Sequence, residues 1–259
     1  MPFGHLPISD DGIPQNNPPY VNGVPTFDDV TVLTVRYRTS FASISHLIPE
    51  VIEVEEEPLV TATILDYKIA PAGPFIEFIH TVEAKYLGKS YDFCLSLILD
   101  NEIAVLTGRE VCGFPKRLGR LSLTPSTSNG TTAHVERPVG KTLVGFSFKP
   151  TIKKSLPSRL DKAFLNLRVF PSPVAGAPAS LKELVPCVFD IKPQEVWEGA
   201  GELILPENYP QKEAVNRIEI LRGLSTTLEE AWKNAALLYI LGCTISYRYC
   251  RKMGAYFAD

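Results

Sequence analysis

A single lysine stands out in the stretch GREVCGFPKRLG, residues 108–119. Lys116 follows Pro115 in an otherwise apolar passage that also contains Phe114. The proline fixes the backbone before the lysine, and Gly113 and Gly119 allow other chain segments to approach closely. A lysine in this setting is either a surface residue whose stem covers apolar groups or a nucleophile that attacks a carbonyl carbon.

The nucleophilic role requires a neutral amine, whereas an ordinary lysine is almost fully protonated at neutral pH. Burial in an apolar pocket disfavours the charged form, and a neighbouring cation such as Arg117 would repel the ammonium. Consecutive side chains of a strand point to opposite faces, so we expect Arg117 to diverge from Lys116. Desolvation is therefore the larger expected effect. Arg117 is interpreted as an orienting residue or as a ligand for a substrate carboxylate.

Short β-rich runs separated by turn residues make up most of the chain. Many strands with few helices between them predict a mainly β fold with some α, an antiparallel barrel or double sheet. Short helices are predicted at 43–49 and 180–186, and one long apolar helix from about Thr226 to Tyr249, in the segment 225–250. The predicted strands are 30–38, 59–67, 75–86, 90–99, 104–110, 141–148 and 164–170.

Composition indicates a globular protein long enough for one large domain or two small ones, and we expect a single domain over residues 1–259 with a proline-rich N-terminal arm over 1–25. The formal net charge of −3 gives no general basic field, so no nucleic-acid partner is expected. No signal-peptide pattern or membrane-length apolar run is present, and the five cysteines lack metal-site spacing. We expect a cytoplasmic protein without a membrane partner, with reduced thiols and with neither a metal nor a cofactor.

The stretch 108–119 resembles the active-site signature of the acetoacetate decarboxylase family, in which the lysine after the proline forms a Schiff base. That family is the standard example of a lysine activated by desolvation or by a nearby cation. The resemblance extends over roughly residues 19–222. It includes the segments VRYRTSFASISHLIPEVIEVEEEPLV (35–60), FIEF (75–78) and VFDIKPQEVWEGAGELIL (188–205).

The resemblance implies roles for individual residues. Lys116 would be the Schiff-base lysine, Glu77 the pocket carboxylate, and Arg38 an arginine near the entrance. From its place on the strand, Arg38 is interpreted either as solvent-facing or as the partner of Glu77 or Glu110 in a buried ion pair. The family's second lysine is replaced by Arg117, and its second pocket glutamate by Thr63. Arg36, on the same strand face as Arg38, is interpreted as solvent-facing. The apolar lining of the pocket is predicted to comprise Phe75, Phe78, Phe93 and Phe114.

Three functions remain open from the sequence. The first is decarboxylation of a β-keto acid through an imine on Lys116, the reaction for which the family is named. The second is aldol condensation and dehydration of a pyruvate-like acid through the same imine, which the loss of a carboxylate at Thr63 keeps open. The third is a non-catalytic barrel that binds a small molecule. The resemblance also implies a homo-oligomer, and the family includes relatives attached to secondary metabolism.

Overall fold

The computed structural model describes residues 1–9, 12–20, 23–126, 130–155, 160–206 and 237–249. Within these ranges, twelve strands form one continuous sheet, and the helical segments are short. The elements are β1 Thr26–Arg38, α1 Phe41–Ile44, the 3-10 turn η1 Ser45–Leu47, β2 Leu59–Ile69, β3 Phe75–Tyr86, β4 Lys89–Leu99, α2 Glu102–Cys112, β5 Lys116–Leu118, β6 Arg120–Ser126, β7 Gly130–Glu136, β8 Thr142–Lys153, β9 Leu160–Phe170, β10 Leu181–Lys192, β11 Glu195–Ile204 and β12 Leu237–Tyr249.

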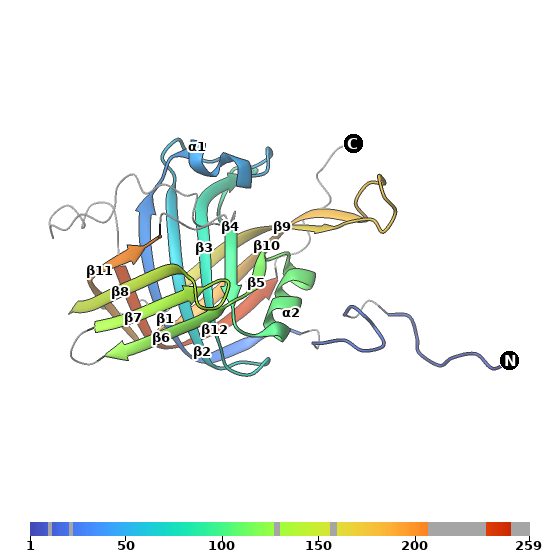
Figure 1. Ribbon diagram of the computed structural model, residues 1–259, viewed down its shortest axis with the longest axis horizontal. Helices are drawn as coiled ribbons and strands as arrows, with labels where there is room; N and C mark the ends of the chain where they lie inside the picture. The colour runs from blue at the N-terminus through green and yellow to red at the C-terminus, as the bar shows by residue number, and fades with distance from the viewer. Residues whose placement is uncertain (10–11, 21–22, 127–129, 156–159, 207–236, 250–259) are drawn as a thin grey trace.

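Seven of these strands close into a barrel. Their order is β1-β2-β3-β4-β9-β10-β12, and antiparallel pairing of β12 with β1 completes the ring. Only the β4–β9 contact in the ring is parallel, and it is limited to two residue pairs. Closure removes the free edges that an open sheet would present. The fold is therefore the mainly β barrel that the strand-rich sequence predicts, with a second sheet added to it (Figure 1).

The second sheet continues from β12 through β11, β8, β7 and β6. It lies against the outer surface of the barrel, and alternate residues of β1–β4 point outward to form a core with it. Leu33, Val35, Phe78 and Phe146 belong to this outer core. The alternate residues of the same strands point inward and form a separate core within the barrel. Val32, next to Leu33 on β1, belongs to this inner core. The two-residue period of the strands thus supplies two apolar cores from the same sequence segments.

Helix α2 follows β4 and lies at the opposite end of the barrel from α1 (Figure 1). The side chain of Asn101 accepts a hydrogen bond from the Ala104 amide at 3.0 Å and so caps its N-terminus. The helix ends at Gly113, whose φ of 71° lies in the left-handed region where glycine is favoured. The sequence prediction of a strand at 104–110 is therefore wrong. Cap residues at both ends outweigh the β-like run AVLT between them.

The predicted C-terminal helix is also wrong where the structure describes it. Residues 237–249 form β12, which pairs with β1 on one edge and with β10 and β11 on the other. A strand with partners on both edges has the same nearly continuous apolar sequence as a buried helix. Residues 226–236, which include the proposed helix start, lie outside the described residues.

The second short helix, predicted over 180–186, is wrong for a similar reason, because β10 covers these residues from Leu181 and pairs along its length with β9. By contrast, the short helix predicted over 43–49 is confirmed in type by α1 and η1. Strands β6 and β7 were not predicted. They pair as an antiparallel hairpin in which Ser126 lies opposite Gly130.

The N-terminal segment is exposed over residues 1–9 and contains no helix or strand there. Tyr20 ties it to α2, since its hydroxyl donates a hydrogen bond to Glu110 Oε2 at 2.5 Å. Burial, followed by this contact with Glu110, raises the pKa of Tyr20 to about 12. In the part of the chain that the structure describes, no helix is long and apolar enough to cross a membrane.

Candidate active site

Lys116 is the first residue of β5, a short strand that runs parallel to β4 with Lys116 opposite Leu97. Strand β9 pairs with β4 only near Asp92 and Phe93, so β5 continues the barrel wall where β9 has turned away. Two hydrogen bonds hold β5 in place. The Leu97 amide donates to the Pro115 carbonyl at 3.2 Å, and Arg109 Nη1 donates to the Lys116 carbonyl at 3.0 Å.

The lysine side chain forms a buried ion pair. Its Nζ lies 2.8 Å from Glu77 Oε1, and the side chains are only 6% and 1% exposed. The other carboxylate oxygen, Oε2, accepts a hydrogen bond from the Tyr67 hydroxyl at 3.2 Å. The ring of Phe75 stacks on Tyr67 with centroids 4.4 Å apart, and the Phe114 ring centroid lies 5.6 Å from Nζ. An amine and a carboxylate thus meet among aromatic rings, away from water.

Gly108 of α2 provides the space for the lysine stem. A Cβ atom at this position would lie 2.5 Å from both Cδ and Cε of Lys116, a separation that real side chains do not tolerate. Gly113, two residues before Pro115, allows a similarly close approach of β9, because a Cβ there would lie 2.6 Å from Cβ of Arg168. The glycines of the signature therefore have a spatial reason: they let α2 and β9 close around the lysine.

Cys94 of β4 is a second nucleophilic side chain close to this pair. It is 4% exposed and interacts electrostatically with both Glu77 and Lys116, and also with Asp92 and Lys162. Burial raises the pKa of the Cys94 thiol well above its usual value, so the sulfur remains protonated at neutral pH. The chemistry available at this place therefore belongs to the amine and the carboxylate.

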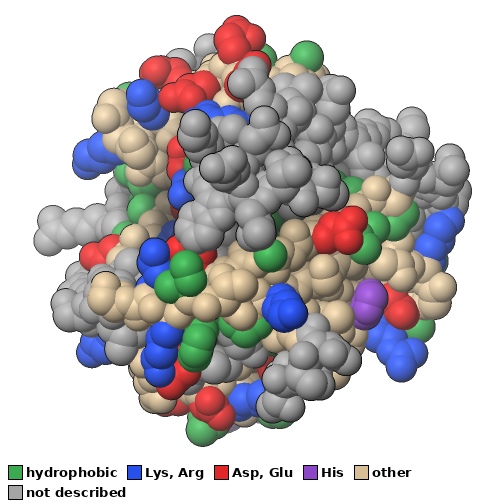
Figure 2. Space-filling view, turned by 90° about the vertical axis from the view of Figure 1, so that its left-hand side faces the viewer, with side chains coloured by type: hydrophobic (Ala, Val, Ile, Leu, Met, Phe, Trp, Pro, Cys, Tyr) green, Lys and Arg blue, Asp and Glu red, His purple; other side chains and the backbone are tan. Residues whose placement is uncertain are grey.

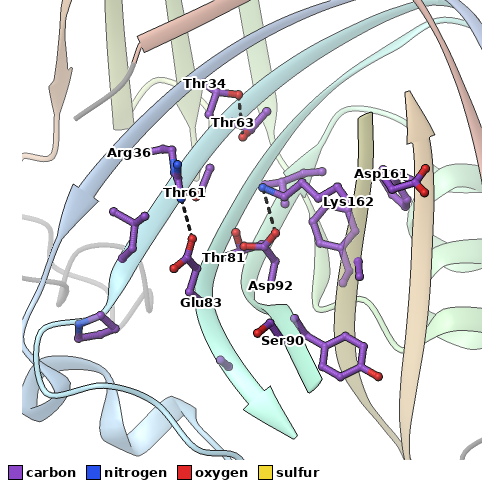
Figure 3. A pocket seen from close by; sticks show the side chains of 18 of the residues that line it. Thr34, Arg36, Thr61, Thr63, Thr81, Glu83, Ser90, Asp92, Asp161 and Lys162 are labelled. Atoms are coloured by element: carbon purple, nitrogen blue, oxygen red, sulfur yellow. Dashed lines mark hydrogen bonds and ion pairs between the residues drawn. The ribbon is translucent and has the colours of Figure 1, made fainter. Parts of the chain in front are cut away.

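A cavity of about 660 Å³ occupies the end of the barrel interior on the side of α1. Threonines from three strands line the cavity, and two ion pairs lie among the other lining side chains (Figure 3). Arg36 Nη2 is 2.6 Å from Glu83 Oε1, and Lys162 Nζ is 3.2 Å from Asp92 Oδ2. Lys116 and Glu77 are not among the residues that line this cavity. It lies next to the buried pair but does not enclose it.

The strand register shows how near the cavity lies to the buried pair of Lys116 and Glu77. Leu65 lines the cavity and is the residue directly opposite Glu77 in the β2–β3 pairing. Directly opposed residues in an antiparallel pair have Cβ atoms about 5 Å apart. Ile79, which also lines the cavity, is two residues from Glu77 on the same face of β3. The inner end of the cavity therefore reaches the neighbours of the carboxylate.

Arg38 does not form the ion pair that the sequence predicted for it. Its Nη1 donates to the Glu57 carbonyl at 2.6 Å and lies 3.3 Å from Glu55 Oε2. It stands six residues along β1 from Val32, the residue in register with Leu65 and hence with Glu77, a separation of about 20 Å along the strand. The predicted pairing of Arg38 with Glu77 or Glu110 is wrong, because Glu77 pairs with Lys116 and Glu110 accepts from Tyr20.

The predicted aromatic lining divides between the two cores. Phe75 and Phe114 belong to the core within the barrel, beside the ion pair. Phe78 and Phe93 belong to the outer core, because the alternation of β3 and β4 turns them away from the interior. Their predicted place in the pocket is wrong. Arg117 is exposed next to buried Lys116, so the two side chains diverge as expected for consecutive strand residues.

Thr63 lines the cavity, and its hydroxyl forms a hydrogen bond with Thr34 at 3.1 Å. Sequence reasoning missed several other residues near the site, above all Tyr67, Gly108 and Arg36. Arg36 shares its inward face with Val32 and Thr34, and continuing that alternation along β1 would have identified it. The contact of Tyr67 with Glu77 joins the neighbouring strands β2 and β3, and no sequence motif marked it.

Comparison with known proteins shows the family of the chain. The acetoacetate decarboxylase (ADC) family profile matches residues 12–233, and the chain belongs to that family. It is 38% identical over 237 residues to decarboxylase DEC1 of Cochliobolus heterostrophus, covering 88% of this chain and 93% of the relative. It is 26% identical over 222 residues to the acetoacetate decarboxylase of Clostridium botulinum, covering 82% and 90%.

Solved structures of the same fold include an acetoacetate decarboxylase with a TM-score of 0.76 and 20% identity, covering 94% of this chain and 96% of that chain. The enduracididine biosynthesis enzyme MppR, complexed with pyruvate, has a TM-score of 0.72 and 15% identity, with coverage of 92% and 96%. At these identities the structures establish a shared fold. Family membership supports a decarboxylase or a related lyase.

Proposed function

We propose that this protein is a lyase that decarboxylates a β-keto acid through an imine on Lys116. The observation that carries the proposal is the contact of 2.8 Å between Lys116 Nζ and Glu77 Oε1 inside the barrel. An amine with an adjacent carboxylate in an apolar setting can form an imine and move the protons that the reaction requires. The 38% identity to decarboxylase DEC1 supports the same reaction class.

In the proposed first steps, the Lys116 ammonium passes a proton to Glu77, and the neutral amine attacks the ketone carbon of the substrate. The carbinolamine then loses water to give a protonated imine, and Glu77 can supply the proton for the departing hydroxyl. The Tyr67 hydroxyl holds the carboxylate of Glu77 in the orientation these transfers need.

The protonated imine next accepts the electron pair that is released when the carbon–carbon bond to the carboxylate breaks and CO₂ leaves. The resulting enamine takes a proton at carbon, and water then attacks the imine to release the ketone and return the free amine. Glu77 lies beside the nitrogen throughout, so its negative charge is placed to stabilise the cationic imine.

Borohydride trapping tests the proposal. The protein is incubated with acetoacetate, longer 3-oxo acids or pyruvate, then reduced and mapped by peptide mass while CO₂ release is followed. We expect CO₂ release with 3-oxo acids and a reduced adduct on the peptide that contains Lys116. Lys116→Ala should abolish both. Lys89→Ala, which removes an exposed lysine at the start of β4, is the matched control and should leave both intact.

The same experiment separates the other functions. An adduct with pyruvate that captures an aldehyde without release of CO₂ would replace the decarboxylase by an aldolase-dehydratase, since both reactions use the same imine. Absence of both an adduct and CO₂ with every acid would contradict an enzymatic role for Lys116 and favour a binding barrel.

The proposed enzyme is a homo-oligomer. Large apolar side chains are exposed in the N-terminal segment, at Phe3, Leu6 and Ile8, and on β9 at Leu167 and Val169. Burying such groups against a second copy would remove apolar surface from water. Light scattering during size-exclusion chromatography should give a mass that is a multiple of 28.6 kDa. A mass equal to one chain would contradict the proposal.

A further inference from the structure

The cavity beside the ion pair is large for the simplest β-keto acid. Its volume of about 660 Å³ lies within the range of roughly 300–1,000 Å³ that encloses drug-sized ligands. Val32, Leu65, Ile79 and Phe164 form its inner end and also belong to the apolar core within the barrel. A ligand that filled this space would therefore pass from apolar contacts near Glu77 to polar groups farther out.

The polar groups are threonines arranged in two cross-strand pairs. Thr34 of β1 is opposite Thr63 of β2, and the two hydroxyls bond to each other at 3.1 Å. Thr61 of β2 is opposite Thr81 of β3, one step farther from Glu77 (Figure 3). Three neighbouring strands thus turn hydroxyl groups toward the same cavity.

Thr81 has a buried hydroxyl group without a hydrogen-bond partner among the described residues. Its side chain is 1% exposed. Buried hydroxyl groups are rarely left in this state, because losing water without a replacement costs about 1–3 kcal/mol. Since Thr81 lines the cavity, an oxygen atom of a bound ligand can supply the missing partner.

The position of Thr81 sets the length of that ligand. It is four residues along β3 from Glu77, which corresponds to about 13 Å in a strand. Acetoacetate bound at Lys116 cannot span this distance. A molecule that reaches both residues needs an extended tail, and an oxygen partway along the tail would meet Thr81.

The charges around the cavity indicate an uncharged tail. Arg36 and Lys162 are each engaged by a carboxylate, Glu83 and Asp92 respectively. The lining also contains Glu53, Glu55 and Asp161 but only one other basic side chain, Lys85. A second anionic group on the ligand would meet this excess of carboxylates and be disfavoured.

We propose that the cavity binds the tail of an extended 3-oxo acid that carries a hydroxyl or keto oxygen along its chain, and that Thr81 binds this oxygen. The proposal rests on the proposed function in placing the keto acid group at Lys116. To the proposed function it adds a substrate class, the extended 3-oxo acids. It also assigns the cavity as the site that binds the tail and Thr81 as a residue that determines specificity.

Steady-state kinetics tests the chain length. Acetoacetate, 3-oxooctanoate and 3-oxododecanoate are compared by kcat/KM for CO₂ release. Burial of the tail should raise kcat/KM with chain length, by up to about fourfold for each methylene that leaves water. A kcat/KM for acetoacetate equal to or above that of the longer acids would overturn the proposal.

Position-specific oxygenation tests Thr81. A set of 3-oxododecanoates carries a hydroxyl at successive tail carbons, and the kcat/KM of each is divided by that of the plain acid. One position should give the highest ratio, and Thr81→Val should lower that ratio about five- to tenfold. Thr132→Val removes an exposed hydroxyl on β7 and is the matched control, with an unchanged ratio expected. An unchanged ratio in Thr81→Val would contradict the assignment.

A binding measurement keeps the two proposals separate. Calorimetry with Lys116→Ala and unreactive 3-hydroxydodecanoates, with and without a tail hydroxyl, reports the cavity without any chemistry. Tighter binding of the tail-hydroxylated ligand that disappears in Lys116→Ala/Thr81→Val would support the cavity site even if no acid released CO₂. No binding of either long-chain ligand would refute the cavity site even if acetoacetate were decarboxylated.

Discussion

Glu77 supplies the carboxylate of the buried pair, 2.8 Å from the Lys116 amine, and carries protons in the reaction that we propose. Glu77→Gln keeps the size of the side chain but removes its ability to carry protons. We expect kcat for CO₂ release to fall by about 10²- to 10⁴-fold, the usual contribution of general acid–base catalysis. The borohydride adduct on Lys116 should persist, because the amine itself remains.

Glu202→Gln, on an exposed part of β11, is the matched control and should leave kcat unchanged. Loss of the adduct together with turnover in folded Glu77→Gln would show that the carboxylate serves to hold the lysine rather than to move protons. Circular dichroism establishes that the variant is folded.

His80 has a different role at the residue scale, one of stability. It is buried in the outer core, 1% exposed, with Nε2 2.7 Å from the Tyr37 hydroxyl. Burial lowers the pKa of His80 to about 3 from its ordinary 6.5. The unfolded chain therefore binds a proton between these pH values and the folded chain does not. The stabilisation is complete above pH 6.5 and is lost as the pH falls toward 3.

The expected result is a free energy of unfolding that drops by about 2 kcal/mol between pH 7 and pH 5 because of this one group. Urea titrations at the two pH values measure it. His80→Gln, which does not titrate, should lose that part of the dependence, whereas His134→Gln on the surface of β7 should retain it. Equal pH dependence in the wild type and His80→Gln would contradict the burial argument.

At the scale of elements, α2 and β5 form a unit that delivers the lysine. Gly108→Ala would place a Cβ 2.5 Å from two carbons of the Lys116 stem. Alanine favours a helix interior over glycine by about 1 kcal/mol, so α2 should not be weakened. We expect kcat/KM to fall by at least about tenfold, with little change in the free energy of unfolding, because the amine is displaced from Glu77.

Kinetics and urea titration on the same preparation check this expectation. Thr107→Ala, at the preceding position of α2, is the control for a change in helix composition, and kcat/KM should remain near that of the wild type. If Gly108→Ala retains full kcat/KM, the lysine has room to move and its position is less critical than the contact implies.

The elements also show what the sequence could predict. Strands β1 to β4 follow from alternation and β-branched residues, and the lysine and glutamate follow from the family signature. Helix α2 was mistaken for a strand because its apolar run is short, although Asn101 and Gly113 already mark its ends. Whether residues 237–249 form a strand depends on partners far away in sequence, so periodicity alone could not separate β12 from a buried helix.

Long-range strand pairing also limited what the sequence could predict about the site. Tyr67 and Glu77 lie on adjacent strands, but which of their neighbours point inward depends on how the barrel closes. The sequence placed Phe75, Phe78, Phe93 and Phe114 in one pocket because all four are aromatic. The closed barrel instead divides them between its interior and its outer core.

At the scale of the molecule, the barrel is held closed by a strand near the end of the chain. Strand β12 pairs with β1 and β10, and Ile245 projects from it as a fully buried member of the interior core. Figure 2 shows acidic and basic side chains interspersed over the described residues of one face of the molecule. Stability of the whole barrel should therefore depend on the packing of β12.

Ile245→Ala tests this dependence. Removing a buried isoleucine side chain should lower the free energy of unfolding by about 2–5 kcal/mol, measured by urea titration with unchanged slope. Ser246→Ala, at the next position of β12 and only half-buried, is the matched control and should cost far less. Because β1 to β4 carry both Glu77 and the cavity wall, catalytic activity and barrel structure should be lost at the same urea concentration. If Ile245→Ala costs less than about 0.5 kcal/mol, or activity disappears well before the barrel unfolds, β12 does not govern closure and the site can open independently of the barrel.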